Sequence, residues 1–142
     1  MRTSARNALH GVVDSIRQGA VTCEINMRLA GEELLHAIVT RESAEELELQ
    51  QGSEVQALIK ASWIILTAPD ANTASSARNR LCGRISRITP GEVNAEVVLE
   101  LSGGQTLAAT ITRQSLDDMQ LQPGAECCAL IKASHVIIGV TE

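Results

Sequence analysis

The 142-residue chain contains no phenylalanine and no tyrosine, and Trp63 is its single tryptophan. A hydrophobic core must therefore be built from aliphatic side chains and methionine. No apolar run approaches the roughly 20 residues that a membrane-spanning helix needs, and no hydrophobic stretch follows the first six residues as it would in a signal peptide. With 44% hydrophobic and 20% charged residues, the composition is typical of a soluble globular protein, which we expect in the cytoplasm.

Basic residues are also scarce. Twelve Lys and Arg residues stand against 17 Asp and Glu residues, which gives a formal net charge of −5. This balance disfavours nonspecific binding to nucleic acid, and we expect neither a nucleic acid nor a membrane as a partner. A small anion is still compatible with it, because such binding depends on local geometry more than on net charge.

The only two lysines, Lys60 and Lys132, both stand in the sequence Ile-Lys-Ala-Ser, 72 residues apart. The sequence Ser-Ala-Arg-Asn also occurs twice, at residues 4–7 and 76–79, with the same spacing. A chain that uses arginine at every other basic position has kept lysine at one place in each of two copies. This pattern predicts one polar site that is built twice in a duplicated domain.

The duplication extends over almost the whole chain, because residues 4–67 align with 76–139 without a gap. A repeat of this kind fixes the domain count. The sequence between the copies is small, polar and proline-bearing, which is typical of a linker. We therefore predict two modules, residues 1–68 and 75–142, with a linker at about 69–74.

The four cysteines are Cys23, Cys82, Cys127 and Cys128, and none has a cysteine at the equivalent position of the other copy. This pattern argues against a disulfide framework and for a reducing compartment. The adjacent Cys127 and Cys128 are expected to point to opposite faces of a strand in a structural role.

Alternation of apolar and polar residues predicts that the chain is mostly β. It is clearest from Val21 to Leu29 and in the equivalent segment of the second copy. Further strands are expected in the first copy at residues 9–16, 35–39, 55–59 and 63–66.

The single helix candidate in the first copy runs from Ser43 to Leu49, where Ser43 and Glu46 fit a capping box. Ser115 and Asp118 form a weaker version in the second copy. Five strands with a short helix after the third predict a mainly β fold of two tandem OB-like five-stranded Greek-key barrels, each with one short helix. Because modules of this size are marginal alone, we expect them to pack on each other or on further chains.

Three motifs carry a resemblance to the Mop family: Ser-Ala-Arg-Asn, Ile-Thr-Arg or Val-Thr-Arg before the predicted helix, and Ile-Lys-Ala-Ser. That family, named for molybdenum-pterin binding, comprises small OB-like modules that bind molybdate. All three motifs occur twice, in order and at equal spacing, so the resemblance covers nearly the whole chain. It is similar to the stand-alone two-module (di-Mop) members. The resemblance implies non-enzymatic binding of molybdate, with tungstate as an analogue, for intracellular molybdenum storage, buffering or homeostasis in a homotrimer.

Molybdate is a tetrahedral dianion that accepts hydrogen bonds, so its site needs convergent donors, positive charge and no carboxylate close by. Lys60 supplies three charged donors, Arg6 supplies a fork of donors, and Thr40 stands where a helix start leaves backbone N–H groups free. By resemblance, the molybdate-binding residues are Ser4, Arg6, Asn7, Thr40, Lys60, Ala61 and Ser62, with Ser76, Arg78, Asn79, Thr112, Lys132, Ala133 and Ser134 in the second copy.

Simpler roles compete for some of these residues. Asn7 and Asn79 are also compatible with turn formation, and Thr40 and Thr112 with helix capping alone. No histidine or cysteine spacing fits a metal site, so we expect no side chain to ligate a metal directly. No nucleophile–base pair occurs in both copies, so we expect no catalytic residues.

Two other functions are alternatives to molybdate binding. A carrier of a molybdenum–pterin cofactor would normally offer an apolar or aromatic cleft, and the scarcity of aromatic residues speaks against it. An OB-type protein that binds single-stranded nucleic acid relies on stacking aromatics and a basic groove, and this chain has one tryptophan and a net negative charge.

Overall fold

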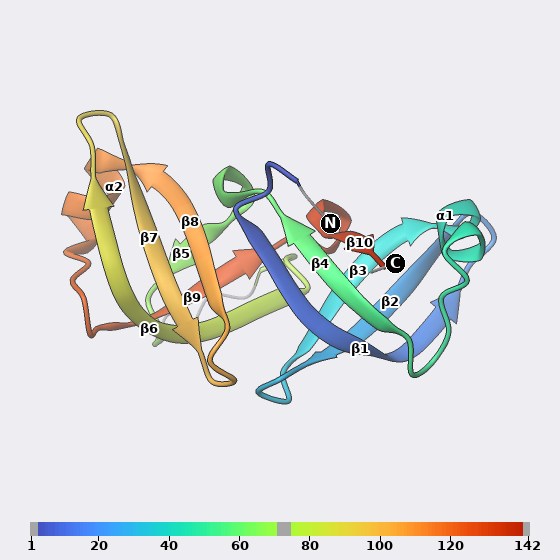
Figure 1. Ribbon diagram of the computed structural model, residues 1–142. Coiled ribbons are helices and arrows are strands. Elements are labelled where there is room, and N and C mark those ends of the chain that lie inside the picture. Colours follow the sequence, from blue (N-terminus) through green and yellow to red (C-terminus); the bar gives the residue numbers. More distant parts are fainter. Residues whose placement is uncertain (1–2, 71–74, 141–142) are drawn as a thin grey trace.

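The computed structural model describes residues 3–70 and 75–140, so residues 71–74 of the expected linker lie outside the described residues. The fold is mainly β, as predicted (Figure 1). The first repeat contains β1 (Asn7–Gln18), β2 (Thr22–Leu29), β3 (Leu34–Thr40), α1 (Arg41–Glu46), β4 (Glu54–Ile59), the 3-10 turn η1 (Ala61–Trp63) and β5 (Ile65–Thr67). The second contains β6 (Asn79–Pro90), β7 (Asn94–Leu101), β8 (Thr106–Thr112), α2 (Arg113–Met119), β9 (Glu126–Ile131), η2 (Ala133–His135) and β10 (Ile137–Gly139).

Each of the two five-stranded sheets takes one strand from the other repeat. The strand orders are β10-β4-β1-β2-β3 and β5-β9-β6-β7-β8. On β10, Ile137 pairs with Leu58, and on β5, Ile65 pairs with Leu130. The prediction of five strands with a helix after the third is confirmed, but the exchange is not visible in the sequence, because a repeat does not say which copy a strand pairs with. The two repeats are therefore interlocked.

The long first strand of each repeat serves two neighbours. The beginning of β1 pairs with β4 and its remainder with β2, and the register shifts between Val13 and Ser15. The same shift occurs in β6 between Ile85 and Arg87. Because such bulges bend a strand and increase its twist, each sheet curls into half of a barrel around its buried face.

One aliphatic core runs through both repeats. The predicted alternation is confirmed in β2, where Cys23, Ile25, Met27 and Leu29 are buried while the residues between them are not. Trp63 is 40% exposed and lies outside this cluster. The absence of aromatic residues is thus matched by a core of leucine, isoleucine, valine, alanine and methionine, together with Cys23 and Cys127.

Two hairpin turns touch where the repeats meet. A Cβ added to Gly31, between β2 and β3, would collide with the Ser102 hydroxyl and the Gly103 amide. A Cβ added to Gly103, between β7 and β8, would collide with the Gly31 amide. Only glycine lets the two backbones approach so closely, so this contact forms a further link between the repeats.

The helices begin earlier than the sequence analysis predicts. Thr40 is the N-cap of α1, and its Oγ1 accepts a hydrogen bond from the Ser43 amide at 3.1 Å. Thr112 caps α2 in the same way through Ser115. The predicted capping boxes are wrong because the two serines occupy the third helical position, after the threonine caps. Neither helix in the described residues is long and apolar enough to cross a membrane.

The cysteines also differ from expectation, because Cys82 and Cys128 form a disulfide. The two residues face each other in the register of β6 and β9. Their equivalents in the first repeat are His10 and Gln56, so comparing the repeats gave no sign of this pairing. Cys127 is a buried free thiol, and burial raises its pKa.

Candidate functional site

Two motifs of the same repeat meet at adjoining strand ends. Asn7 at the start of β1 pairs with Ile59 at the end of β4. Arg6 and Lys60 are the next residues beyond this pair, so they lie opposite each other at the adjoining strand ends. The second repeat has the same pairing between β6 and β9. The four cationic side chains concerned are all exposed: Arg6, Lys60, Arg78 and Lys132. The beginnings of β1 and β6 lie near the middle of the molecule, whereas α1 and α2 lie at its opposite ends (Figure 1).

The Lys-Ala-Ser segment folds as a tight 3-10 turn. The Trp63 amide donates to the Lys60 carbonyl at 3.0 Å, so the amides of Ala61 and Ser62 are not used by the turn itself. Ala61 is buried and Ser62 is exposed. The turn therefore presents an ammonium group, a hydroxyl and small residues to an approaching ligand, and η2 repeats this arrangement.

The two turns lie close together. The ring centroids of Trp63 and His135 are 4.9 Å apart, and the Lys60 Nζ lies 5.6 Å from the Trp63 centroid, within cation–π range. Neither Trp63 nor His135 was among the predicted site residues. The signal that could have pointed to them is that they occupy equivalent positions in the two copies, because the pseudo-symmetry of the repeats brings these positions together.

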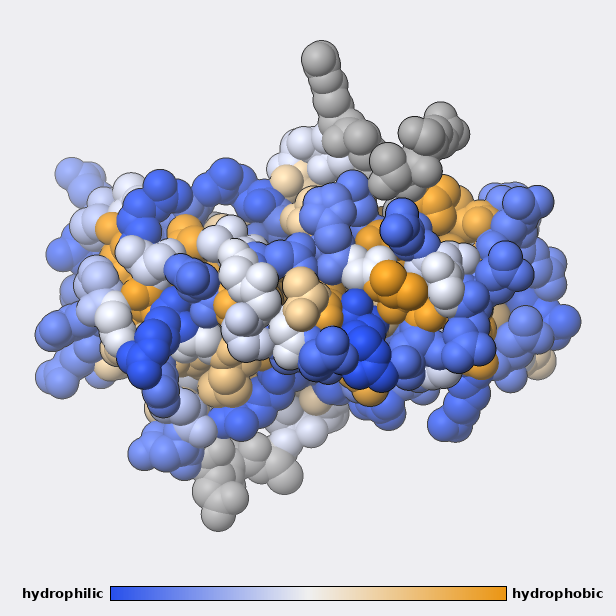
Figure 2. Space-filling model, turned by 60° about the horizontal axis from the view of Figure 1, so that its bottom comes forward, coloured by the Kyte–Doolittle hydropathy of each residue, from blue (hydrophilic) through white to orange (hydrophobic). Residues whose placement is uncertain are grey.

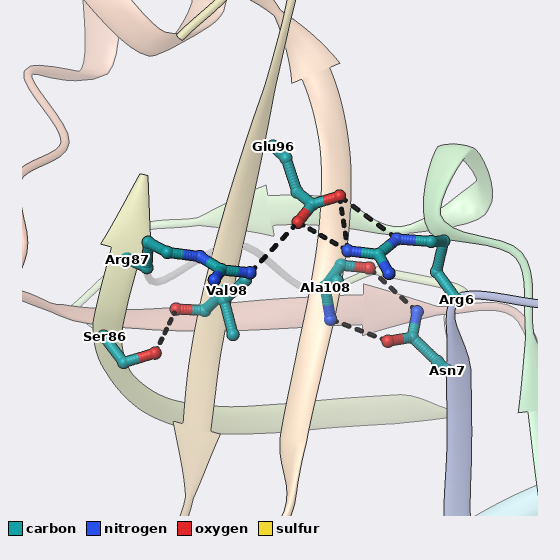
Figure 3. A network of polar contacts seen from close by, with 7 residues as sticks. All are labelled: Arg6, Asn7, Ser86, Arg87, Glu96, Val98 and Ala108. Carbon is teal, nitrogen blue, oxygen red and sulfur yellow. Dashed lines mark hydrogen bonds and ion pairs between the residues drawn. The ribbon is translucent and has the colours of Figure 1, made fainter. Parts of the chain in front are cut away.

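Asn7 is buried and bonded across the boundary between the repeats. Its Nδ2 donates to the carbonyl of Ala108 at 2.8 Å and to that of Ile59 at 3.2 Å, and its Oδ1 accepts from the Ala108 amide at 2.7 Å (Figure 3). The side chain thus pairs with β8 as another strand would. This contact uses both amide N–H groups, which leaves Asn7 no donor for an anion.

Asn79 makes the reciprocal contact with the first repeat. Its Oδ1 accepts from the His36 amide at 2.7 Å and its Nδ2 donates to the His36 carbonyl at 2.8 Å. His36 and Ala108 are equivalent positions on β3 and β8. The structure therefore uses both asparagines to join the repeats. This role differs from the two that the sequence suggested, ligand binding and turn formation.

Each motif arginine forms an ion pair with the other repeat. Arg6 binds Glu96 on β7 through two nitrogens, with Nη2 2.7 Å from Oε1 and Nε 3.2 Å from Oε2 (Figure 3). Arg78 Nη2 lies 2.5 Å from Oε1 of Glu24 on β2. A carboxylate therefore lies beside each motif arginine, so the requirement of a molybdate site for no carboxylate close by is not met in this structure. Glu24 and Glu96 lie on the polar faces of alternating strands, which in sequence read as solvent-facing.

Thr40 and Thr112 stand at the ends of β3 and β8, where they cap the two helices. Thr112 pairs with Asn94 on β7, two residues from Glu96 and hence about 7 Å along the strand. Thr112 thus belongs to the strand pair that carries Glu96, the partner of Arg6, and Thr40 is related through Thr22 to Glu24, the partner of Arg78. Ser4 and Ser76 are exposed in the bends before β1 and β6.

The surroundings of the two ion pairs differ. His36 Nδ1 lies 3.6 Å from Glu24 Oε1, whereas on the other side Arg87 Nη2 lies 3.6 Å from Glu96 Oε1. Burial, and then the charge of Arg78, lower the pKa of His36, while Glu24 opposes this shift. The two halves of the site are therefore related but not identical.

Apart from Glu24 and Glu96, the site consists of hydrogen-bond donors and cations. Within residues 3–70 and 75–140, no group of three or more His, Cys, Asp and Glu residues could hold a metal ion. Two open surface grooves of about 640 and 500 Å³ lie around Gly83 and Gly11, and no predicted site residue lines either of them.

Comparison with known proteins places this geometry in context. The family model described as the TOBE domain matches residues 3–66 and 75–138. The chain is 42% identical over 140 residues to the molybdenum-pterin-binding protein MopB of Rhodobacter capsulatus and 41% identical over 140 residues to the molybdenum transport protein ModE of Azotobacter vinelandii. These alignments cover 99% of this chain but 52% of each relative, so the chain spans about half their length.

A solved structure matches from end to end. The cytoplasmic molybdate-binding protein ModG, in a crystal form with molybdate bound, is 43% identical to this chain with a TM-score of 0.95. The match covers 99% of this chain and 100% of the ModG chain.

Proposed function

Since the chain belongs to the TOBE-domain family and has two such domains in tandem, we propose that it binds molybdate, and tungstate as an analogue, without catalysing a reaction. It serves to store or buffer molybdenum in the cytoplasm. The similarity to ModG, which is a cytoplasmic molybdate-binding protein, supports both the ligand and the compartment. A disulfide is uncommon in the cytoplasm, so the redox state of Cys82 and Cys128 in cells is a direct check on the compartment.

The observation that carries the proposal is the meeting of an arginine and a lysine at adjoining strand ends, twice, on the boundary between the repeats. A tetrahedral dianion accepts hydrogen bonds from Arg6, Lys60 and the Ser62 hydroxyl. The contacts proposed for one site come from Ser4, Arg6, Lys60, Ala61, Ser62 and Thr112, and those for its counterpart come from Ser76, Arg78, Lys132, Ala133, Ser134 and Thr40. Asn7 and Asn79 hold the boundary instead of touching the ligand.

Melting curves at matched ionic strength test the ligand. A ligand that binds only the folded protein stabilises it by about 2.7 kcal/mol per site at a free concentration a hundredfold above its Kd. Molybdate and tungstate should raise the melting temperature more than sulfate, because donors spaced for the larger anion close incompletely on the smaller one. Equal shifts from sulfate would indicate a general anion effect. A shift from a pterin or from single-stranded DNA alone would favour those ligands instead.

We also propose that the chain assembles as a homotrimer. Exposed apolar side chains recur at equivalent places: Val21 and Val93 are 75% and 76% exposed, and Ile65 and Ile137 are 64% and 54% exposed. Apolar side chains form several patches on the largely polar face in Figure 2. Covering such patches favours association. Light scattering should give the mass of three chains of 15.1 kDa, and a monomer with molybdate bound would contradict the assembly.

A further inference from the structure

Each motif arginine gives its guanidinium to a carboxylate of the other repeat. Arg6 contacts Glu96, and Arg78 contacts Glu24. The two glutamates occupy equivalent positions, 72 residues apart, so the same contact is formed twice in opposite directions across the boundary. Its presence in both halves of a duplicated chain indicates a feature of the module and not a chance surface pair.

The geometry sets this carboxylate in competition with an anion. Glu96 occupies the Nε–Nη2 edge of Arg6, one of the edges through which a guanidinium binds an oxyanion in bidentate fashion. A dianion about 5 Å from a carboxylate is disfavoured roughly tenfold even at the dielectric constant of water. The arginine side chains are 56% and 54% exposed, so an anion can reach them from solvent.

Each carboxylate also has a second polar neighbour. Arg6 and Arg87 approach Glu96 from opposite sides (Figure 3), and Arg87 Nη2 lies 3.6 Å from Oε1. His36 Nδ1 lies 3.6 Å from Oε1 of Glu24 and is also in contact with the Asn26 Oδ1. Losing the arginine therefore does not leave either glutamate, whose side chains are 25% and 19% exposed, without a polar neighbour.

We propose that Glu24 and Glu96 are displaceable counter-ions: the oxyanion takes over the fork of Arg78 or Arg6, and the carboxylate turns away from it. This proposal rests on the proposed binding of molybdate. It assigns the two glutamates a role in setting affinity, because binding requires exchange of one anion for another. To displace the carboxylate, a ligand must interact with the arginine more strongly than the carboxylate does, which favours a dianion over a monoanion.

The test is isothermal titration of the full chain with sodium molybdate at low ionic strength, using Glu96→Gln, Glu24→Gln and the double variant. Exposed ion pairs shift equilibria by about two- to fivefold, and removal of the repulsion adds to this, so affinity should rise by about two- to tenfold at unchanged stoichiometry. Glu126→Gln is the matched control, because Glu126 also pairs with an arginine, Arg84, at 3.3 Å. It stands at the far end of β9 from Lys132, about 20 Å along the strand.

Two other outcomes of the titration would overturn the proposal. If the carboxylates orient the arginines instead of competing, the glutamine variants will bind molybdate more weakly than the control, which would overturn the proposal. An affinity equal to that of Glu126→Gln would overturn it too. Glu96→Asp, which keeps the charge but shortens its reach, should raise affinity less than Glu96→Gln and serves if the glutamine variant folds poorly. Failure of the unaltered protein to bind molybdate would remove both the function and this proposal, whereas the preceding outcomes remove the proposal alone.

Discussion

Replacing Asn7 with alanine tests whether the buried asparagine holds the two repeats together. The residue is 2% exposed and forms three hydrogen bonds, with the Ala108 amide and carbonyl and with the Ile59 carbonyl. The substitution leaves these buried backbone groups without that partner. A typical hydrogen bond contributes about 0.5–1.5 kcal/mol net, and an unsatisfied buried group costs about 1–3 kcal/mol. Allowing for water in the vacated space, we expect a loss of about 2–4 kcal/mol.

Urea unfolding with linear extrapolation measures this loss, at one fixed protein concentration because assembly also affects stability. Asn26→Ala is the matched control, since Asn26 is only partly buried and bonds to Ser15 and His36 within its own repeat. Its cost should stay below about 1 kcal/mol. Equal losses in Asn7→Ala and Asn26→Ala would refute the reasoning that the contact across the boundary is the stronger one.

Four further outcomes are expected. Lys60→Ala and Lys132→Ala should each weaken molybdate binding by about ten- to a hundredfold at the affected site, because a charged donor contributes about 1.5–3 kcal/mol; normal titration of the double variant would contradict the assignment. The pKa of His36 lies below its ordinary 6.5 in the folded protein, so the unfolded chain protonates first and stability falls as pH drops below about 6.5. His36→Ala, which copies Ala108, should reduce that fall, and an unchanged profile would count against it. In the oxidised protein, reduction of the disulfide between Cys82 and Cys128 should raise the intact mass by two hydrogens. The buried thiols of Cys23 and Cys127 should resist alkylation until the protein unfolds, and rapid labelling of these two thiols in the folded protein would disprove this. Finally, thermal unfolding should be a single transition because the sheets exchange strands, and two separate transitions would show independent modules.

Much of the fold could be predicted because it depends on local patterns. Alternation over residues 21–29 marks a half-buried strand whatever its neighbours are, and the 72-residue repeat transfers that assignment to the second copy. The motifs were recognisable for the same reason, since Lys60 and Lys132 keep their neighbours in both copies. The predicted helix N-cap lies three residues too late because threonine and serine are both good N-caps, and the sequence alone did not decide between Thr40 and Ser43.

The contacts between the repeats could not be predicted, because the partners are distant in sequence and differ in type. Glu24 fits the exposed face of its strand, and nothing in its neighbourhood indicates Arg78 as its partner. Asn7 similarly belongs to a motif whose exposed arginine suggests a ligand, while the asparagine itself points into the boundary. Cys82 and Cys128 pair through a register that the repeat hides, since the equivalent residues are not cysteines.

The exchange of strands explains why the candidate site lies where it does. Lys60 and η1 connect β4, which stays in the first sheet, to β5, which joins the second sheet. The Lys-Ala-Ser turn is therefore the crossing point of the chain, and η2 is the crossing point in the other direction. Separating the two sheets would require these turns to move relative to the arginines beside them. An anion held at the proposed site by a crossing turn and a motif arginine would oppose that movement, so its binding would stabilise the same arrangement as the docking of the repeats.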